Sequence, residues 1–199
     1  MRRKAMKRIA VVIYEGFSMF EFSVALEILA MSSQYAIDIF GEERKNYRSE
    51  EGLLAVSEYD LHEMKTEDYE GIILTGFSNE NPTLVHNQLF MEKIQEFDRE
   101  HKMIAAISAT PVFLIKAGVL KDYSFMCGCP KDGLKEEGFT DDELKFMVAW
   151  EECVKQYDTL KFIRHDNIIT SVAYGYREWA IEIGNMLGIK TYPRSFGLS

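Results

Sequence analysis

Four short, almost wholly apolar runs lie within the first 107 residues of the chain, and glycine follows closely after three of them. A run of this length without polar alternation is typical of a strand that is covered on both faces, as in a parallel sheet. Such strands need helices on both sides of the sheet, because neither face can be left in water. The four runs are residues 9–14, 35–40, 71–74 and 103–107.

The segments between and after these runs carry apolar side chains at helical spacing. This alternation predicts a three-layer α/β/α sandwich, in which a mostly parallel sheet lies between two layers of helices. Ligands of such sheets bind at the carboxyl ends of the strands, so the residues just after Tyr14, Leu74 and Ile107 are candidates for a site. The predicted helices are residues 19–31, 84–99, 111–117 and 175–187.

Shorter elements are expected in the remaining segments. Acidic residues at the start of one segment suit the dipole of a helix. Two apolar runs around a polar turn indicate a hairpin near the C-terminus. The expected bounds are an extended pair at Arg48 and 53–56, a short strand at 124–127, a helix at 141–150, and a hairpin formed by 160–163 and 168–172.

The chain has 199 residues, of which 47% are hydrophobic, enough to bury the core of one domain without disulfides or metals. We expect a single domain over residues 7–199, preceded by a disordered basic leader at residues 1–6. The formal net charge is −9. A surface this acidic repels phosphate backbones and anionic lipid, so neither nucleic acid nor a membrane surface is an expected partner.

The three cysteines favour a reducing compartment, because a secreted disulfide framework normally carries an even set. No apolar stretch is long enough to cross a bilayer, and the apolar run near the N-terminus is too short for a signal peptide. We therefore expect a cytoplasmic protein. Cys127 and Cys129 are only two residues apart, but a metal site normally needs four ligands, so we expect ordinary packing there and no metal.

The segment from Ala105 to Pro111 carries the strongest functional signal. An apolar strand passes through small residues directly into a helix, with Thr110 as a good N-cap and Pro111 suited to the first turn. A tight turn of this kind lifts one side chain above the sheet edge, as in a nucleophile elbow, and Ser108 stands at the raised position. An ordinary strand–helix turn accounts for the same residues, so both readings stay open.

Two roles are open to Glu21, which stands at the start of the first predicted helix. Ser18 and Glu21 have the spacing of a capping box, in which each side chain satisfies an unpaired amide of the other residue. Alternatively, the Glu21 carboxylate faces the strand ends and hydrogen-bonds whatever Ser108 presents.

Glycine directly after a buried strand allows close approach of a ligand to the backbone, and Gly76 has this position, followed by Phe77. The amides of Gly76 and Ala109 are therefore candidates for an oxyanion hole. The alternative is that Gly76 is simply a turn residue.

Several of these stretches resemble the ThiJ/PfpI family, within the class I glutamine amidotransferase-like superfamily. The resemblance implies a flavodoxin-like fold, a homodimer, a small-molecule ligand and no cofactor. Family members carry a glutamate on the first helix that hydrogen-bonds a reactive cysteine, and Glu21 falls at its position. The matching stretches are residues 9–17 with Glu21, 26–27, 72–76, 105–111, 116–120, 167–171 and 174–175.

The chain departs from the family pattern at the elbow. Ser108 replaces the cysteine, Thr110 replaces a common glycine, and Ala109 stands where protease-type members carry histidine. Another family histidine falls near Cys129, which makes Cys129 a candidate pocket residue. A serine hydroxyl needs a positioned base, whereas a cysteine is partly thiolate near neutral pH. We therefore do not expect the thiol chemistry of the family.

Two classes of function fit these observations. One is a hydrolase or hydratase for a small carbonyl, amide or isonitrile compound, in which Ser108 is the nucleophile or orients water and Glu21 is the acid–base. The other is a non-catalytic sensor or partner-binding protein that has kept the pocket and lost the thiol. The fold alone does not choose between them.

Overall fold

A computed structural model describes residues 6–77, 82–120 and 122–199. Of the predicted basic leader, only Met6 belongs to the described part, so that prediction lies otherwise outside the described residues. Within the described part, no helix is both long enough and apolar enough to pass through a membrane.

A seven-stranded sheet forms the centre, in the order β10-β11-β7-β6-β1-β2-β5. All neighbouring strands are parallel except β10 and β11, which form the predicted antiparallel hairpin. This confirms the mostly parallel sheet. The strands are β1 Lys7–Val12, β2 Tyr35–Gly41, β5 Tyr59–Asp60, β6 Gly71–Leu74, β7 Met103–Ile107, β10 Phe162–His165 and β11 Ile168–Ser171.

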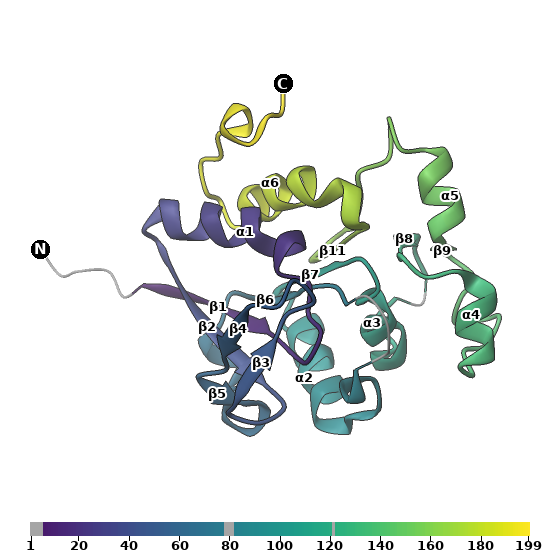
Figure 1. Ribbon diagram of the computed structural model, residues 1–199, viewed down its shortest axis with the longest axis horizontal. Helices are drawn as coiled ribbons and strands as arrows, with labels where there is room; N and C mark the ends of the chain where they lie inside the picture. The colour runs from purple at the N-terminus through teal and green to yellow at the C-terminus, as the bar shows by residue number, and fades with distance from the viewer. Residues whose placement is uncertain (1–5, 78–81, 121) are drawn as a thin grey trace, which may run out of the picture.

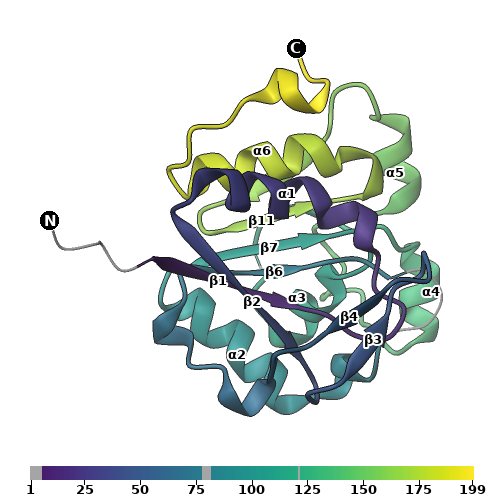
Figure 2. The ribbon, with the colours of Figure 1, turned by 60° about the vertical axis from the view of Figure 1, so that its left-hand side comes forward.

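Helices cover both faces of this sheet, with α1 and α6 on one side and α2 and α3 on the other (Figure 1, Figure 2). Large side chains from both layers, among them Trp179, Phe90 and Phe113, are fully buried against the strands. The three-layer α/β/α sandwich is thus confirmed. These helices are α1 Met19–Ser32, α2 Gln88–Arg99, α3 Pro111–Ala117 and α6 Tyr176–Met186.

The strand register brings three strand ends to the same level. Val12 pairs with Leu74, Leu74 pairs with Ala106, and Ile107 pairs with Ser171. Consequently the loops after β1, β6 and β7 emerge side by side at the carboxyl edge of the sheet, where ligands of parallel sheets bind.

Smaller elements surround this edge. A hairpin of β3 and β4 follows β2, and the pair β8–β9 with helices α4 and α5 lies beside β11 and β10 (Figure 1). Their bounds are β3 Asn46–Arg48, β4 Leu54–Val56, β8 Phe125–Met126, β9 Met147–Val148, α4 Lys131–Glu136, α5 Trp150–Lys155 and the 3₁₀ turns Leu61–Glu63, Thr66–Asp68, Thr83–His86, Ala173–Gly175 and Pro193–Phe196.

The predicted helix at residues 141–150 is wrong. Residues 141–146 form turns, β9 follows, and the helix α5 begins only at Trp150. The reason is tertiary: Phe125 donates its amide to the carbonyl of Phe146, at 3.3 Å, and thereby draws the chain into a short parallel pair with β8. Met147 is buried, and either a helix or a strand over this segment could bury it. The apolar spacing alone therefore does not distinguish a helix from a strand here.

Candidate active site

Ser108 stands at a sharp turn between β7 and α3. Its φ is 63°, in the left-handed region that is costly for a residue with a side chain. Two hydrogen bonds hold this conformation: Ser108 donates its amide to the carbonyl of Ser171, at 2.9 Å, and its own carbonyl accepts from the amide of Gly128, at 2.6 Å. The residue is only partly buried. A side chain raised on a sharp strand–helix turn with a left-handed φ is the shape that a nucleophile elbow also has.

Thr110 contributes to the elbow differently from the prediction. It occupies the N-cap position of α3, with Pro111 following as expected, but its hydroxyl caps no amide of the helix. Instead Oγ1 accepts from the amide of Ile107, at 3.0 Å, and lies 2.7 Å from the Ile107 carbonyl and 3.2 Å from that of Leu74. Thr110 thus ties the ends of β6 and β7 together beneath Ser108.

The capping-box role of Glu21 is not realised, because the Ser18 side chain makes no cap hydrogen bond. A different carboxylate caps the start of α1. Glu51, in the turn between β3 and β4, accepts hydrogen bonds from the amides of Met19, at 3.1 Å, and Phe20, at 2.9 Å. Glu21 therefore takes no part in capping α1. Its side chain lies at the strand ends and is 4% exposed.

Burial raises the pKa of Glu21 to about 7, and the negative charges of Glu50 and Glu51 add to this effect. Interaction with the Ser108 side chain and the Gly76 amide acts in the opposite direction, because both stabilise the carboxylate. One carboxyl oxygen, Oε2, is buried and has no hydrogen-bond partner within the described part of the chain. Glu21 is therefore a carboxyl group that exchanges a proton near neutral pH.

Gly76 completes the contact between Glu21 and Ser108. A Cβ at this position would collide with Glu21 Oε2 and would lie 2.5 Å from Ser108 Cβ, so only glycine fits. The carbonyl of Gly76 accepts from the amide of Ser18, at 2.8 Å, and the Thr75 hydroxyl donates to the carbonyl of Ser18. These bonds fix the β1–α1 loop over the end of β6. Since the amide of Gly76 faces Glu21, an incoming oxyanion has to compete with that carboxyl for it.

The other predicted residues surround this trio. Phe77 packs at edge-to-face angles near Tyr14, with ring centroids 5.8 Å apart, and forms an aromatic wall with Phe113. Ala109 is buried in the elbow itself. Cys129 is half-buried and follows Gly128, whose amide holds the Ser108 carbonyl.

Two residues that contact the candidate site have no signal in the sequence. Glu51 lies 30 residues after Glu21 in a polar segment without a motif, so only the folded hairpin brings it to α1. Gly128 lies between two cysteines whose spacing predicts ordinary packing. The close approach of Gly128 to Ser108, with 3.0 Å between a virtual Cβ and the Ser108 carbonyl carbon, has no local sequence signal.

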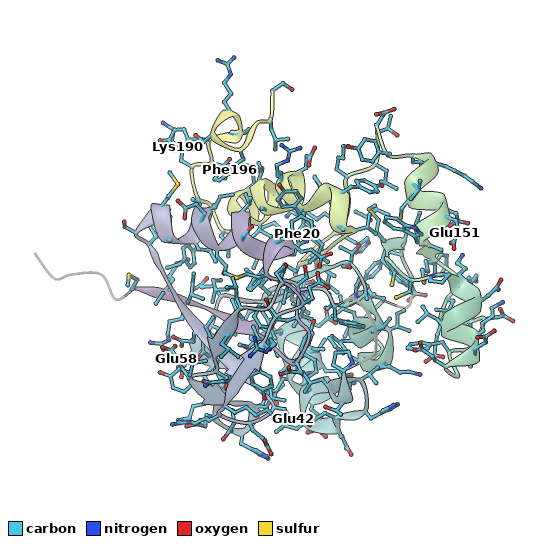
Figure 3. The ribbon with its side chains drawn as sticks, viewed as in Figure 1. Phe20, Glu42, Glu58, Glu151, Lys190 and Phe196 are labelled. Atoms are coloured by element: carbon cyan, nitrogen blue, oxygen red, sulfur yellow. The ribbon has the colours of Figure 1, made fainter. Side chains whose placement is uncertain are left out.

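All four histidines are exposed and stand away from this trio. His101 lies 3.2 Å from Asp166, and His165 stacks on Tyr123 with ring centroids 3.7 Å apart. Within the described residues, Glu21 is a titratable side chain that interacts with Ser108. Phe20, labelled in Figure 3, lies on the first turn of α1. Its ring packs against that of Tyr176 at the start of α6, with ring centroids 5.0 Å apart.

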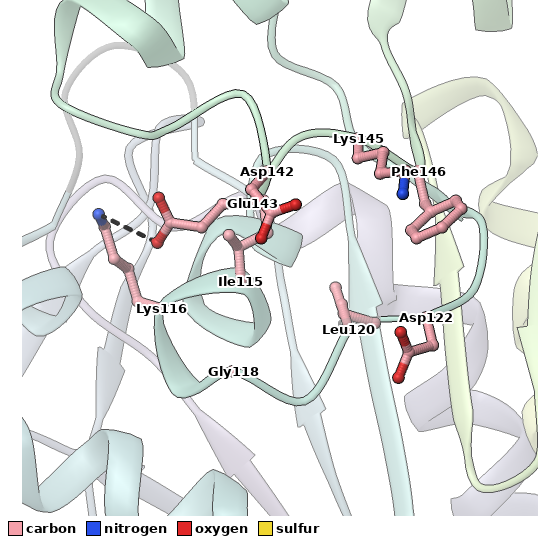
Figure 4. A pocket seen from close by; sticks show the side chains of 9 residues that line it. All are labelled: Ile115, Lys116, Gly118, Leu120, Asp122, Asp142, Glu143, Lys145 and Phe146. Carbon is pink, nitrogen blue, oxygen red and sulfur yellow. Dashed lines mark ion pairs between the residues drawn. The ribbon is translucent and has the colours of Figure 1, made fainter.

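A separate surface cavity of about 570 Å³ lies between α3 and the turns at residues 142–146 (Figure 4). It mixes charges of both signs, and Lys116 and Glu143 approach each other at 4.0 Å across it. Its lining contains none of the predicted site residues. The lining residues are Ile115, Lys116, Gly118, Leu120, Asp122, Asp142, Glu143, Lys145 and Phe146.

Replacing Ser108 with glycine is expected to raise the free energy of unfolding by about 1 kcal/mol, because glycine adopts a left-handed φ without steric cost. Urea unfolding measures the change. Ser108→Ala is the matched control: it removes the hydroxyl and keeps the Cβ, so it should show no such gain. Equal stabilisation by both variants would contradict a strained elbow.

The sequence profile of the DJ-1/PfpI family matches residues 7–184. The chain is 31% identical over 64 residues to the uncharacterized protein MJ0967 of Methanocaldococcus jannaschii, a match that covers 32% of this chain and 31% of that relative's length. Sequence similarity to this curated relative is therefore limited to about a third of each protein.

Solved structures share the fold over almost the whole chain. The DJ-1 superfamily protein Atu0886 from Agrobacterium tumefaciens superposes with a TM-score of 0.75 at 15% identity, covering 96% of this chain and 95% of that one. A two-domain protein with DJ-1/ThiJ/PfpI-like and ferritin-like domains from Anabaena variabilis gives 0.74 at 17% identity, covering 92% of this chain and 48% of that one. With an elbow at Ser108 and a profile match over most of its length, the chain belongs to the DJ-1/PfpI family.

Proposed function

We propose that the protein catalyses the addition of water to a small polarised compound, an isonitrile, carbonyl or amide, with Glu21 as the general acid–base. The observation that carries the proposal is a buried carboxyl group, with a pKa of about 7, in contact with the strained Ser108. A general acid–base works best when its pKa lies near the working pH, because both protonation states are then populated.

Water, rather than Ser108, is the nucleophile in this proposal. An alcohol needs a strong base to become nucleophilic, and the exposed histidines do not supply one. Glu21 takes a proton from the water molecule as its oxygen bonds to the electrophilic carbon, and then returns that proton to the substrate. For an isonitrile or a carbonyl compound, the net change is the addition of one water. For an amide, the C–N bond of the water adduct then breaks and the amine leaves with the proton that Glu21 returns. The Ser108 hydroxyl orients the water, and the amide of Ala109 faces the developing negative charge.

The second candidate is a sensor that binds a small polar molecule without turning it over. The absence of the family's elbow thiol, replaced by Ser108, favours it. Both candidates retain the family expectation of a cytoplasmic homodimer, which sedimentation of the purified chain and fractionation of cells test directly.

The test incubates the protein with a simple isonitrile, a 2-oxoaldehyde and a primary amide, and follows the products by proton NMR. We expect hydration of one of the three compounds, reduced about tenfold in Ser108→Ala because one orienting hydrogen bond is lost. Turnover that is unchanged by Ser108→Ala would exclude a role of the hydroxyl. Saturable binding without product, weakened by the same variant, would identify the sensor instead.

A further inference from the structure

All three cysteines of the chain gather beneath the elbow, although Cys153 is distant in sequence from the other two. Cys127 donates its amide to the carbonyl of Val148, at 3.1 Å, and the Cys153 thiol donates to the same carbonyl, at 3.3 Å. Cys127 Sγ also lies 4.0 Å from the carbonyl of Ala109. Within the described residues, no group of three potential ligands is arranged for a metal ion.

The members of this cluster differ in exposure. Cys127 and Cys153 are fully buried, whereas Cys129 is reached by solvent. Interaction between the two side chains lowers the pKa of Cys129 and raises that of Cys127, and burial of Cys127 adds to the second effect. An accessible sulfur with thiolate character beside a buried, protonated thiol is the arrangement of an attacking and a resolving cysteine.

The backbone between the two thiols favours their approach. Two residues of extended chain span about 6.6–7.2 Å, slightly beyond the usual Cα separation of about 4.4–6.8 Å across a disulfide. The chain bends at Gly128 and Cys129, which shortens this span, and glycine supplies the conformational freedom for further closure.

We propose that Cys127 and Cys129 form a peroxide-oxidisable dithiol that closes to a disulfide and so alters the elbow at Ser108. The link to the elbow is Gly128, whose amide donates to the Ser108 carbonyl at 2.6 Å. Gly128 lies inside the ring that the disulfide closes, so ring closure rotates the peptide that makes this hydrogen bond.

The oxidation balances with a hydroperoxide as the oxidant. The Cys129 thiolate attacks the terminal oxygen, the O–O bond breaks, and hydroxide (or alkoxide) leaves to become water (or alcohol). Cys129 is then a sulfenic acid. The Cys127 sulfur attacks Cys129 Sγ, the S–O bond breaks, and the departing hydroxide takes the proton of the Cys127 thiol as water. Dithiol and hydrogen peroxide thus give disulfide and two waters.

Peptide mapping of the wild-type protein tests the first half of the proposal. Tryptic cleavage releases Asp122–Lys131, which holds both thiols, and separates it from the peptide that holds Cys153. After brief treatment with hydrogen peroxide we expect this peptide to lose the mass of two hydrogen atoms and to regain it with dithiothreitol. An unchanged peptide, or one that gains only oxygen atoms, would overturn the proposal.

Single variants separate the roles of the thiols. Cys127→Ser should trap a sulfenic acid at Cys129, detected as a dimedone adduct, and Cys129→Ser should abolish oxidation. Cys153→Ser is the matched control and should oxidise like wild type. In the reduced protein, iodoacetamide should alkylate Cys129 at least about tenfold faster than Cys153 at pH 7. Equal rates, or loss of oxidation in Cys153→Ser, would contradict these assignments.

Hydrogen–deuterium exchange tests the coupling to the elbow. Oxidation should speed exchange in residues 122–131 and in the elbow segment 103–116. Exchange should stay unchanged in β2 and β5, at the edge of the sheet opposite to β10 and β11. Disulfide formation without any change at 103–116 would overturn the coupling, and neither result depends on the proposed hydratase activity.

Discussion

Replacing Glu21 with glutamine is expected to reduce the loss of stability that wild type shows between pH 5 and pH 8, and to remove most of the proposed activity. Glu21 is 4% exposed and its pKa is raised from 4.5 to about 7. Folding therefore favours the neutral carboxyl, whose stabilising effect is complete below pH 4.5 and is lost as the pH rises to 7. Glutamine is neutral at every pH and avoids this loss.

The expected size follows from the shift. Between pH 5 and pH 8, wild type should lose roughly 2–3 kcal/mol more of its unfolding free energy than Glu21→Gln does. Urea unfolding at both pH values measures this difference. The matched control is Glu27→Gln, since Glu27 is exposed on the same helix and its replacement should leave the pH dependence unchanged. If the unfolding free energies of wild type and Glu21→Gln depended on pH in the same way, ionisation of Glu21 would not destabilise the fold, and the prediction would be contradicted.

The same variant tests the catalytic role. Loss of a general acid–base usually lowers a rate by about 10²–10⁴-fold, and we expect a loss of this size in the hydration assay. In wild type, the rate should depend on a group that titrates near pH 7, and this dependence should vanish with Glu21. A variant that is more stable at pH 8 and yet inactive would show that the protein retains a destabilising carboxyl for its chemistry.

Replacing Gly76 with alanine is expected to lower the unfolding free energy by about 3 kcal/mol and to abolish the contact between Glu21 and Ser108. The added methyl group collides with Glu21 Oε2 and the Ser108 side chain, and overpacking of a buried site has a cost of this order. Because the Ser18 and Thr75 bonds hold the loop in place, the strand end cannot simply withdraw.

Gly133→Ala provides the matched control. Gly133 lies in α4, and a Cβ there meets Pro130 only at 3.4 Å, an ordinary contact. Alanine favours helix over glycine by up to about 1 kcal/mol, so this variant should be at least as stable as wild type. Urea unfolding of both variants, with the hydration assay for Gly76→Ala, makes the comparison. A Gly76→Ala protein as stable as Gly133→Ala would contradict the close packing at Gly76.

The alternation of buried strands and helices was predictable because each strand is too apolar to tolerate an exposed face. The same logic located Ser108 and Gly76, since both follow such strands directly. Residues 141–150 were not predictable, because their apolar spacing suits a helix or a strand equally and the pairing with β8 decides. Whether Glu21 caps α1 or faces the strand ends also depends on a residue distant in sequence, Glu51, which caps the helix instead. No local sequence pattern predicts that contact.

The turn between β3 and β4 is a surface hairpin tip, and its acidic residues affect the ionisation of the buried Glu21 carboxyl. Glu51 satisfies the amides at the start of α1, and the charge of Glu50 raises the pKa of Glu21. Hairpin tips tolerate insertion and exchange far better than core strands do. Two acidic residues in a replaceable loop thus add to the effect of burial on the pKa of Glu21, so a hairpin tip without these charges should lower that pKa while the residues of the elbow stay the same.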